Sequence, residues 1–220
     1  MLEARFLLSI SSSWCAFRPI FQAQPTHSRL DFAVPMDALT LLNHRNSEPK
    51  LTKPGPDREA LQKIVAAALR APDHGRLRPW RFLSIEGKAR YRLGDLFVEA
   101  LKQRKPEASE EEIKKTAEAP LRAPLIIVVI AKQIENAKVP AVEQLLSAGC
   151  AAHGILLAAQ ALDFGAIWRT GDNSYDPYVN TALGLSENET LVGYIYIGTP
   201  IGVPKPLPML PVEEFIKAWG

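Results

Sequence analysis

The stretch Ala71-Pro72-Asp73-His74, followed by Pro79-Trp80, separates a helical pattern from a strand pattern and so organises the chain. Two prolines and Gly75 cannot continue a helix, so residues 71–79 are expected to form a loop. The basic side chains of Arg70 and His74 stand on either side of Ala71-Pro72-Asp73. Because proline fixes the path of a loop, this segment suits the edge of a binding site. The alternative is a solvated loop in which His74 caps a turn.

Helical patterns precede this loop and recur after the strand that follows it. Asp37 is expected to cap a helix that runs to about Arg45, and Asp57 is expected to cap a second helix. Further helices are predicted over residues 88–103 and from Ser109, where Glu112 three residues later completes a capping box.

Strand patterns and one long apolar helix make up the rest of the chain. Residues 125–130 are apolar and largely β-branched, which predicts a central strand buried on both faces. Residues 142–164 are helical and apolar nearly all round, so they are expected at the middle of the domain or in a subunit interface. Further strands are predicted over residues 80–85 and 191–197. Because helices and strands do not alternate as regular βαβ units, the predicted class is α+β, with a mixed sheet surrounded by helices.

The composition fits one soluble domain. Of 220 residues, 47% are hydrophobic and 23% are charged, which is enough for one sizeable core. The 26 basic and 24 acidic side chains leave a net charge of only +2, which argues against a nucleic-acid partner. The longest uninterrupted apolar run, residues 125–131, is far shorter than the roughly 20 residues that a membrane helix needs. Cys150 lies in an apolar helical run, and a buried free thiol there would fit a reducing, cytoplasmic compartment.

Residues 1–35 differ from the rest of the chain in composition. They contain three arginines but only two acidic residues, Glu3 and Asp31. A secretory signal would need a longer apolar centre, whereas an organellar transit peptide would suit this composition. The interpretation that we favour is that translation begins at Met36, which makes residues 36–220 the folded domain.

Several other chemistries lack their motifs. Neither Gly-x-Gly-x-x-Gly nor Gly-x-x-x-x-Gly-Lys is present, so a Rossmann or P-loop nucleotide site has no support. Gly-x-Ser-x-Gly is also missing. No metal site is expected, because the four histidines show no metal-ligand spacing with one another or with either cysteine. His153, on the long apolar helix, is expected to be a hydrogen-bonded core residue.

Arg45 and Ser47 offer a guanidinium and a hydroxyl two residues apart, at the end of the first predicted helix. A phosphate monoester suits this pair, because arginine forks onto two oxygens and a hydroxyl or amide can reach the third. Asn46 between them adds hydrogen-bond donors without charge. The alternative is an ordinary helix C-terminus, where a cation interacts favourably with the helix dipole.

Three segments together carry a resemblance to a known family: Arg45-Asn46-Ser47, the loop from Ala71 to Trp80, and Phe164-Gly165-Ala166-Ile167-Trp168-Arg169. Their order and approximate spacing resemble those of the FMN-dependent nitroreductases, in particular the small YdjA-type NAD(P)H nitroreductases. The resemblance covers residues 36–220. It implies the nitroreductase fold, a homodimer, FMN as the cofactor and NAD(P)H as the electron donor.

The resemblance also implies the residues of the site. FMN is expected to be held by Arg45, Asn46, Ser47, Trp168, Arg169 and Thr170 of one subunit, with Arg70 and His74 approaching from the neighbouring subunit. Backbone N–H donors along residues 168–171 suit the flavin pyrimidine ring, which accumulates negative charge on reduction. NAD(P)H is expected along Ala158, Ala159, Gln160, Ala161, Leu162 and Asp163, although these residue types by themselves indicate buried helix packing. No side chain is expected to act as a catalytic acid or base.

The chain departs from the family pattern at three positions. Asn46 replaces the second arginine of the phosphate element, and Arg76 and Arg78 stand where amides are usual. The implied function is hydride transfer from NAD(P)H to FMN, followed by reduction of a nitroaromatic or quinone acceptor in a ping-pong sequence. Two alternatives stay open. One is a flavin-binding module without turnover, which Arg78 favours, and the other is a flavin enzyme of another reaction such as dehalogenation.

Overall fold

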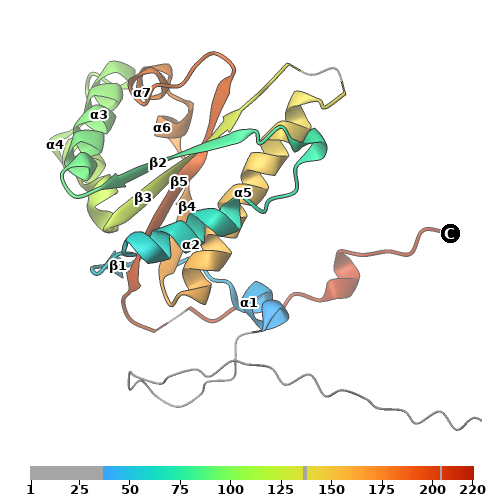
Figure 1. Ribbon diagram of the computed structural model, residues 1–220. Coiled ribbons are helices and arrows are strands. Elements are labelled where there is room, and N and C mark those ends of the chain that lie inside the picture. Colours follow the sequence, from blue (N-terminus) through green and yellow to red (C-terminus); the bar gives the residue numbers. More distant parts are fainter. Residues whose placement is uncertain (1–36, 136–137, 204) are drawn as a thin grey trace, which may run out of the picture. The chain divides into compact units, whose positions relative to one another are not determined.

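The computed structural model describes residues 37–135, 138–203 and 205–220 (Figure 1). The expectations for residues 1–35 therefore lie outside the described residues. The helices are α1 (Ala38–His44), α2 (Arg58–Ala68), α3 (Ala89–Arg104), α4 (Glu110–Glu118), α5 (Ala141–Ala161), α6 (Asp172–Tyr175) and α7 (Pro177–Ala182). Three 3₁₀ turns are η1 (His74–Arg76), η2 (Ala119–Arg122) and η3 (Val212–Glu214). The strands are β1 (Leu51–Thr52), β2 (Trp80–Glu86), β3 (Leu125–Lys132), β4 (Gly165–Arg169) and β5 (Glu189–Pro200).

The local signals for helix starts are confirmed. The carboxylate of Asp37 accepts hydrogen bonds from two backbone N–H groups of α1, and Asp57 accepts one from α2. Ser109 and Glu112 form the predicted reciprocal capping box at the start of α4. Each of these caps satisfies N–H groups that have no partner inside the helix.

The five strands form one sheet in the order β1-β5-β3-β2, with β4 also paired to β5. Every described pairing is antiparallel, which corrects the expectation of a mixed sheet, while the α+β class is confirmed. The long strand β5 pairs with β3 along one edge and with β4 and β1 along the other. This arrangement places β4 at the outer edge of the sheet, beside the start of β1.

The sheet lies between two helical layers, with α2 and α5 on one face and α3 and α4 on the other (Figure 1). Successive side chains of a strand point to opposite faces, so β3 contributes to both cores. Ile127 and Val129 pack toward α5, and Ile126, Val128 and Ile130 pack toward α3. All five are buried, which confirms that this strand is covered on both faces.

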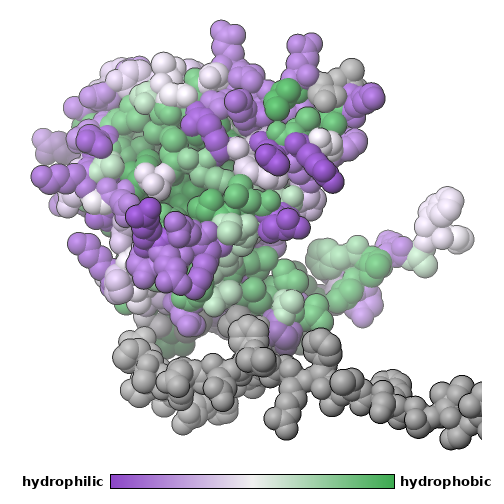
Figure 2. All heavy atoms as spheres, in the orientation of Figure 1, coloured by the Kyte–Doolittle hydropathy of each residue, from purple (hydrophilic) through white to green (hydrophobic). Residues whose placement is uncertain are grey.

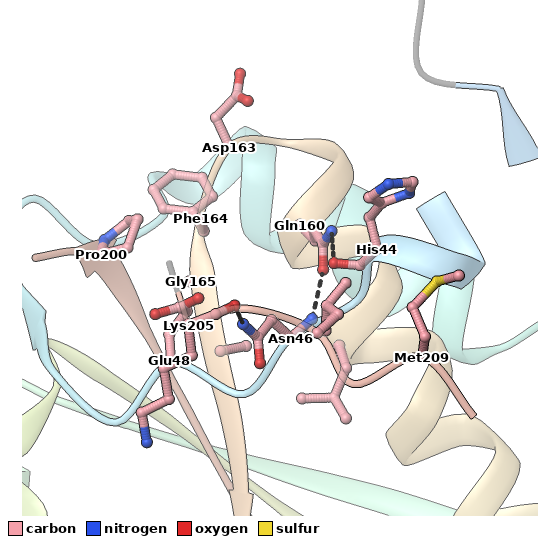
Figure 3. Close-up of a pocket in the computed structure, with 13 residues that line it drawn as sticks. His44, Asn46, Glu48, Gln160, Asp163, Phe164, Gly165, Pro200, Lys205 and Met209 are labelled. Carbon is pink, nitrogen blue, oxygen red and sulfur yellow. Dashed lines mark hydrogen bonds between the residues drawn. The ribbon is translucent and has the colours of Figure 1, made fainter. Parts of the chain in front are cut away.

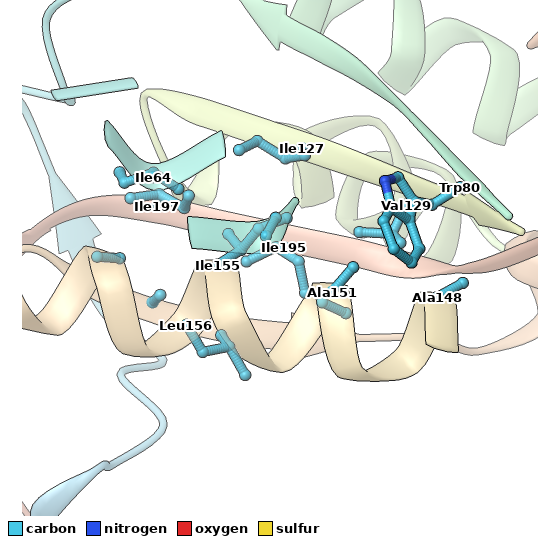
Figure 4. Packing of buried hydrophobic residues seen from close by; sticks show 14 of the residues in the cluster. Ile64, Trp80, Ile127, Val129, Ala148, Ala151, Ile155, Leu156, Ile195 and Ile197 are labelled. Atoms are coloured by element: carbon cyan, nitrogen blue, oxygen red, sulfur yellow. The ribbon is translucent and has the colours of Figure 1, made fainter. Parts of the chain in front are cut away.

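Helix α5 lies along the sheet and packs through small residues (Figure 4). Ala148, Ala151 and Ile155 are fully buried against β3 and β5. A Cβ on Gly154 would lie 3.3 Å from the backbone of α2, so the two helices cross closely. By length and composition alone α5 could cross a membrane, a test that core helices of soluble proteins also pass.

The opposite face of α5 is exposed, which corrects two expectations. Cys150 and His153 are both exposed, and neither is part of the core. Val142 and Leu146 are exposed on the same face. The sequence is apolar nearly all round this helix, so periodicity could not show which face the sheet would cover. The helix also ends at Ala161 rather than at Phe164, because Asp163 adopts a left-handed backbone (φ 61°).

Gly193 of β5 allows a close approach between the sheet and an aromatic side chain. Trp168 of β4 donates a hydrogen bond from Nε1 to the carbonyl oxygen of Val192 (3.2 Å). A Cβ on Gly193 would lie 2.2 Å from that nitrogen, and the residue has a φ of +154°. Glycine at this position therefore permits both the strand conformation and the seat of the Trp168 indole.

Replacing Gly193 with alanine should lower the free energy of unfolding by about 3 kcal/mol, because the methyl group overlaps the indole and strains the backbone. Gly87→Ala is the matched control, since Gly87 also has a positive φ (54°) but nothing within 4 Å of the added methyl. Its expected cost is only about 1 to 2 kcal/mol. Urea unfolding of both variants measures the difference, and equal losses would contradict the role assigned to the Trp168 contact.

Candidate functional site

The segment after α1 is held by the C-terminal end of α5 (Figure 3). The side chain of Gln160 donates to the carbonyl oxygen of His44 (3.0 Å) and accepts from the backbone N–H of Asn46 (3.3 Å). Asn46 in turn donates from Nδ2 to the carbonyl oxygen of Lys205 (2.9 Å). Three segments distant in sequence therefore meet through neutral amide hydrogen bonds.

The two groups expected to hold a phosphate lie together in this segment. Arg45 Nη1 and Ser47 Oγ are 3.5 Å apart, so the guanidinium and the hydroxyl can reach one anion. The backbone N–H of Glu48 donates to the carbonyl oxygen of Ala166 (3.0 Å), which places the segment beside β4. A ligand held at Ser47 would therefore begin at the start of β4.

A cavity of about 680 Å³ opens at this junction, and we call it the α5-end cavity. Figure 3 shows its lining residues. They come from α5 and the turn after it, from β4, from residues 44–48 and from the C-terminal tail: His44, Asn46, Glu48, Leu156, Gln160, Asp163, Phe164, Gly165, Ala166, Pro200, Lys205, Leu207 and Met209. Lys205 brings a cation that no sequence motif marked, because its position depends on where the proline-rich tail returns.

The expected NAD(P)H residues have varied environments. Ala159 is fully buried in the core, and Ala158 and Leu162 pack against the same core. Gln160 is occupied in holding residues 44–46, and Asp163 lines the α5-end cavity. Ala161 is exposed. Only the polar members of this set therefore present a side chain to the cavity.

The expected flavin residues of β4 lie at the far end of that strand. The side chain of Trp168 lies on the α5 face, where it contacts the core. The guanidinium of Arg169 lies over the ring of Tyr196, with its carbon 5.7 Å from the ring centre. A second cavity, of about 510 Å³, opens here between β4, β5, α3 and η2; we call it the arginine-tyrosine cavity. Burial raises the pKa of Tyr196, and the nearby Arg169 and Arg122 oppose that shift.

The loop from Arg70 to Trp80 lies at the opposite end of α5. His74 Nδ1 is 2.8 Å from Glu143 Oε2, in the first turn of the helix. The Asp73 carboxylate accepts hydrogen bonds from the backbone N–H groups of Leu77 (3.1 Å) and Arg78 (2.7 Å). Gly75, Arg76 and Arg78 all have a left-handed backbone, so this loop turns tightly. Arg70, Arg76 and Arg78 line a third cavity, of about 460 Å³.

The length of α5 separates the two groups of expected flavin residues. Glu143 and Gln160 are 17 residues apart, and an α-helix rises 1.5 Å per residue, so the loop and the Arg45 segment lie about 25 Å apart. Arg70 and His74 therefore do not join Arg45 and Ser47 within one chain. A single site that contains both groups requires a second subunit.

Comparisons with known proteins show the family of the chain. Residues 42–199 match the model of the nitroreductase family. The "Putative NAD(P)H nitroreductase YdjA" of Escherichia coli K12 is 45% identical over 184 residues, which cover 80% of this chain and 98% of that protein. The "Putative NAD(P)H nitroreductase" of Haemophilus influenzae is 42% identical over 165 residues, which cover 74% of this chain and 89% of that protein.

Two solved structures share the fold. The nitroreductase-like family protein of Bacillus cereus superposes with a TM-score of 0.72 at 21% identity, over 90% of this chain and 99% of its own. A nitroreductase of Desulfovibrio desulfuricans, solved in complex with FMN, superposes with a TM-score of 0.65 at 23% identity, over 83% of this chain and 96% of its own. The fold, the family match and the two close relatives agree, and the chain belongs to the nitroreductase family.

Proposed function

We propose that this protein is an FMN-dependent oxidoreductase that uses NAD(P)H to reduce nitroaromatic or quinone-type acceptors. The observation that carries the proposal is the Arg45 and Ser47 pair beside β4, next to the α5-end cavity, whose lining includes Lys205 but neither member of the pair. A guanidinium, a hydroxyl and an ammonium group are the donors that a phosphate monoester requires. The names of the two bacterial relatives support the choice of donor and reaction.

The residues present fit FMN in two respects. Arg45, Ser47 and Lys205 would hold its phosphate, and the backbone of Trp168, Arg169 and Thr170 would lie beside its ring system. The proposed phosphate residues and the proposed ring contacts lie along the same strand, because the backbone of Glu48, next to Ser47, bonds to Ala166 near the start of β4. When bound, FMN supplies the redox centre that accepts a hydride from NAD(P)H and passes electrons to the acceptor. The protein binds and orients the reactants, and we assign no side chain as a general acid or base.

We further propose that residues 36–220 form the catalytic domain and that it works as a homodimer. Antiparallel pairing of two copies of α5 would bring the Arg70 and His74 loop of one subunit to the Arg45 segment of the other. The exposed apolar face of α5, with Val142 and Leu146, suits such pairing. The C-terminal tail offers more apolar surface, which Figure 2 shows as a largely green extension, and Phe215 and Trp219 on it are exposed.

Steady-state kinetics test the reaction. With NADH or NADPH as donor and a quinone as acceptor, double-reciprocal plots should show parallel lines, because donor and acceptor use one site in turn. Intersecting lines would require two separate sites. A flavin-loaded protein that oxidises neither NADH nor NADPH would instead support the flavin-binding module, for which the replacement of amides by Arg76 and Arg78 is the motivating feature.

Arg45→Ala should weaken FMN binding by about ten- to a hundredfold, since a hydrogen bond to a charged group contributes roughly 1.5 to 3 kcal/mol. Riboflavin lacks the phosphate and serves as the matched ligand, so its affinity for both proteins should be the same. Flavin fluorescence titrations measure all four dissociation constants. Unchanged FMN affinity in the variant would exclude Arg45 from the phosphate site and make Lys205 the next candidate.

Light scattering should give about twice the chain mass of 24.3 kDa. Leu146→Glu places a charge on the exposed apolar face of α5, and it should yield monomers that lose flavin together with the second subunit. Tyr91→Glu is the control, because Tyr91 is also exposed but lies on α3, across the sheet. A wild-type monomer that retains flavin would refute the shared site.

A further inference from the structure

The residues that line the arginine-tyrosine cavity suit an anionic ligand. Two arginines line it, Arg169 from β4 and Arg122 from η2, and no carboxylate does among the residues that the structure describes. Arg169 lies over the ring of Tyr196, and both arginines oppose the rise that burial causes in the pKa of this tyrosine. Two positive charges therefore meet at the Tyr196 side of the cavity, and none of the described residues that line it is a carboxylate.

The carboxylate of Asp176 is already engaged. Asp176 caps α7 through the backbone N–H groups of Tyr178 and Val179, and it also forms an ion pair with Arg104. The Asn173 side chain accepts a second hydrogen bond from the same arginine (2.9 Å). Because the Asp176 carboxylate already pairs with Arg104 of α3 and caps α7, it does not neutralise Arg122 or Arg169.

Polar atoms of the cavity lack partners among the described residues. Tyr196 is only 4% exposed and lines the cavity, yet its hydroxyl makes no hydrogen bond there. Arg169 Nε is buried and has no hydrogen-bond partner either. By contrast, the hydroxyl of the neighbouring Tyr194 donates to the carbonyl oxygen of Asn173 (3.2 Å). Buried donors without a partner are uncommon in folded proteins, and Arg169 Nε is such a donor at this cavity.

The size and walls of the cavity select among anions. A volume of about 510 Å³ is far larger than one inorganic anion needs and falls in the range of small-molecule sites. Much of the wall is apolar or aromatic, with Phe97, Ile167 and Tyr194. A carboxylate accepts hydrogen bonds on two oxygens, which matches two guanidinium groups and one hydroxyl. An aromatic body would fill the remaining space.

We propose that the arginine-tyrosine cavity binds a small aromatic carboxylate, with its carboxylate on Arg122, Arg169 and the Tyr196 hydroxyl. The FMN phosphate is proposed at the start of β4, whereas this site lies at the end of the strand, where the backbone of Arg169 is proposed to lie beside the FMN ring and its side chain lines the cavity. The side chains of Arg169 and Trp168 point to opposite faces of the strand, so the ligand lies on the α3 face of the sheet.

Isothermal titration of the full chain, as purified, with benzoate tests the proposal. Benzoate should bind saturably, and benzamide, which has the same shape without the charge, should bind at least tenfold more weakly. Arg122→Gln and Tyr196→Phe should each weaken benzoate binding by about tenfold or more. Arg122 is exposed, and phenylalanine keeps the ring of residue 196, so both variants are expected to fold.

Two controls separate this site from the proposed flavin site. Lys102→Gln removes an exposed cation from α3 that does not line the cavity, and it should leave benzoate affinity unchanged. Arg45→Ala should lower FMN affinity and leave benzoate affinity unchanged. The proposal is overturned if benzoate does not bind, if benzamide binds equally well, or if Arg122→Gln and Tyr196→Phe both bind benzoate as the wild type does.

Discussion

The rigidity of α5 is the constraint on which the candidate site depends. A 21-residue helix cannot shorten, so its two ends hold the Arg70 and His74 loop and the Arg45 segment at a fixed separation. The sheet sets the position of the helix, because Ala151 and Ile155 are fully buried against β3 and β5. Each end is then attached by a specific contact, Glu143 with His74 at one end and Gln160 with Asn46 at the other.

The sheet supplies the second half of the arrangement. Strand β5 bonds to neighbours on both edges, so β4 occupies a fixed register against it, with Trp168 opposite Ile195. Glycine is required where the indole of Trp168 crosses β5 at Gly193, and again at Gly198, where a Cβ would approach Pro124 within 2.5 Å. The β4 backbone beside the Arg45 segment is therefore held in place by close packing rather than by flexible side chains.

Sequence reasoning succeeded where the signal was local. Caps at Asp37, Asp57 and Ser109 lie within one turn of the groups that they satisfy, so their residue types were sufficient. Cys150 and His153 were predicted to be buried but are exposed, because an evenly apolar helix gives no sign of which face the sheet covers.

Contacts between segments distant in sequence could not be predicted from local patterns. Gln160 holds residues 116 and 114 positions away, and Lys205 approaches Asn46 across 159 positions. The antiparallel sheet was also missed, since strand direction depends on how β4 and β5 return and not on the residues within each strand. The Arg45 and Ser47 side chains, two residues apart, do lie together as the sequence indicated, and their role in holding a phosphate stays a prediction.

The placement of the two groups at opposite ends of α5 has a genetic consequence. In the proposed dimer each site takes Arg45 from one subunit and Arg70 from the other. A mixed dimer of one subunit damaged at Arg45 and one damaged at Arg70 would carry both lesions in one site and none in the other. Two inactive alleles could then complement each other, and the hybrid would retain half of its sites.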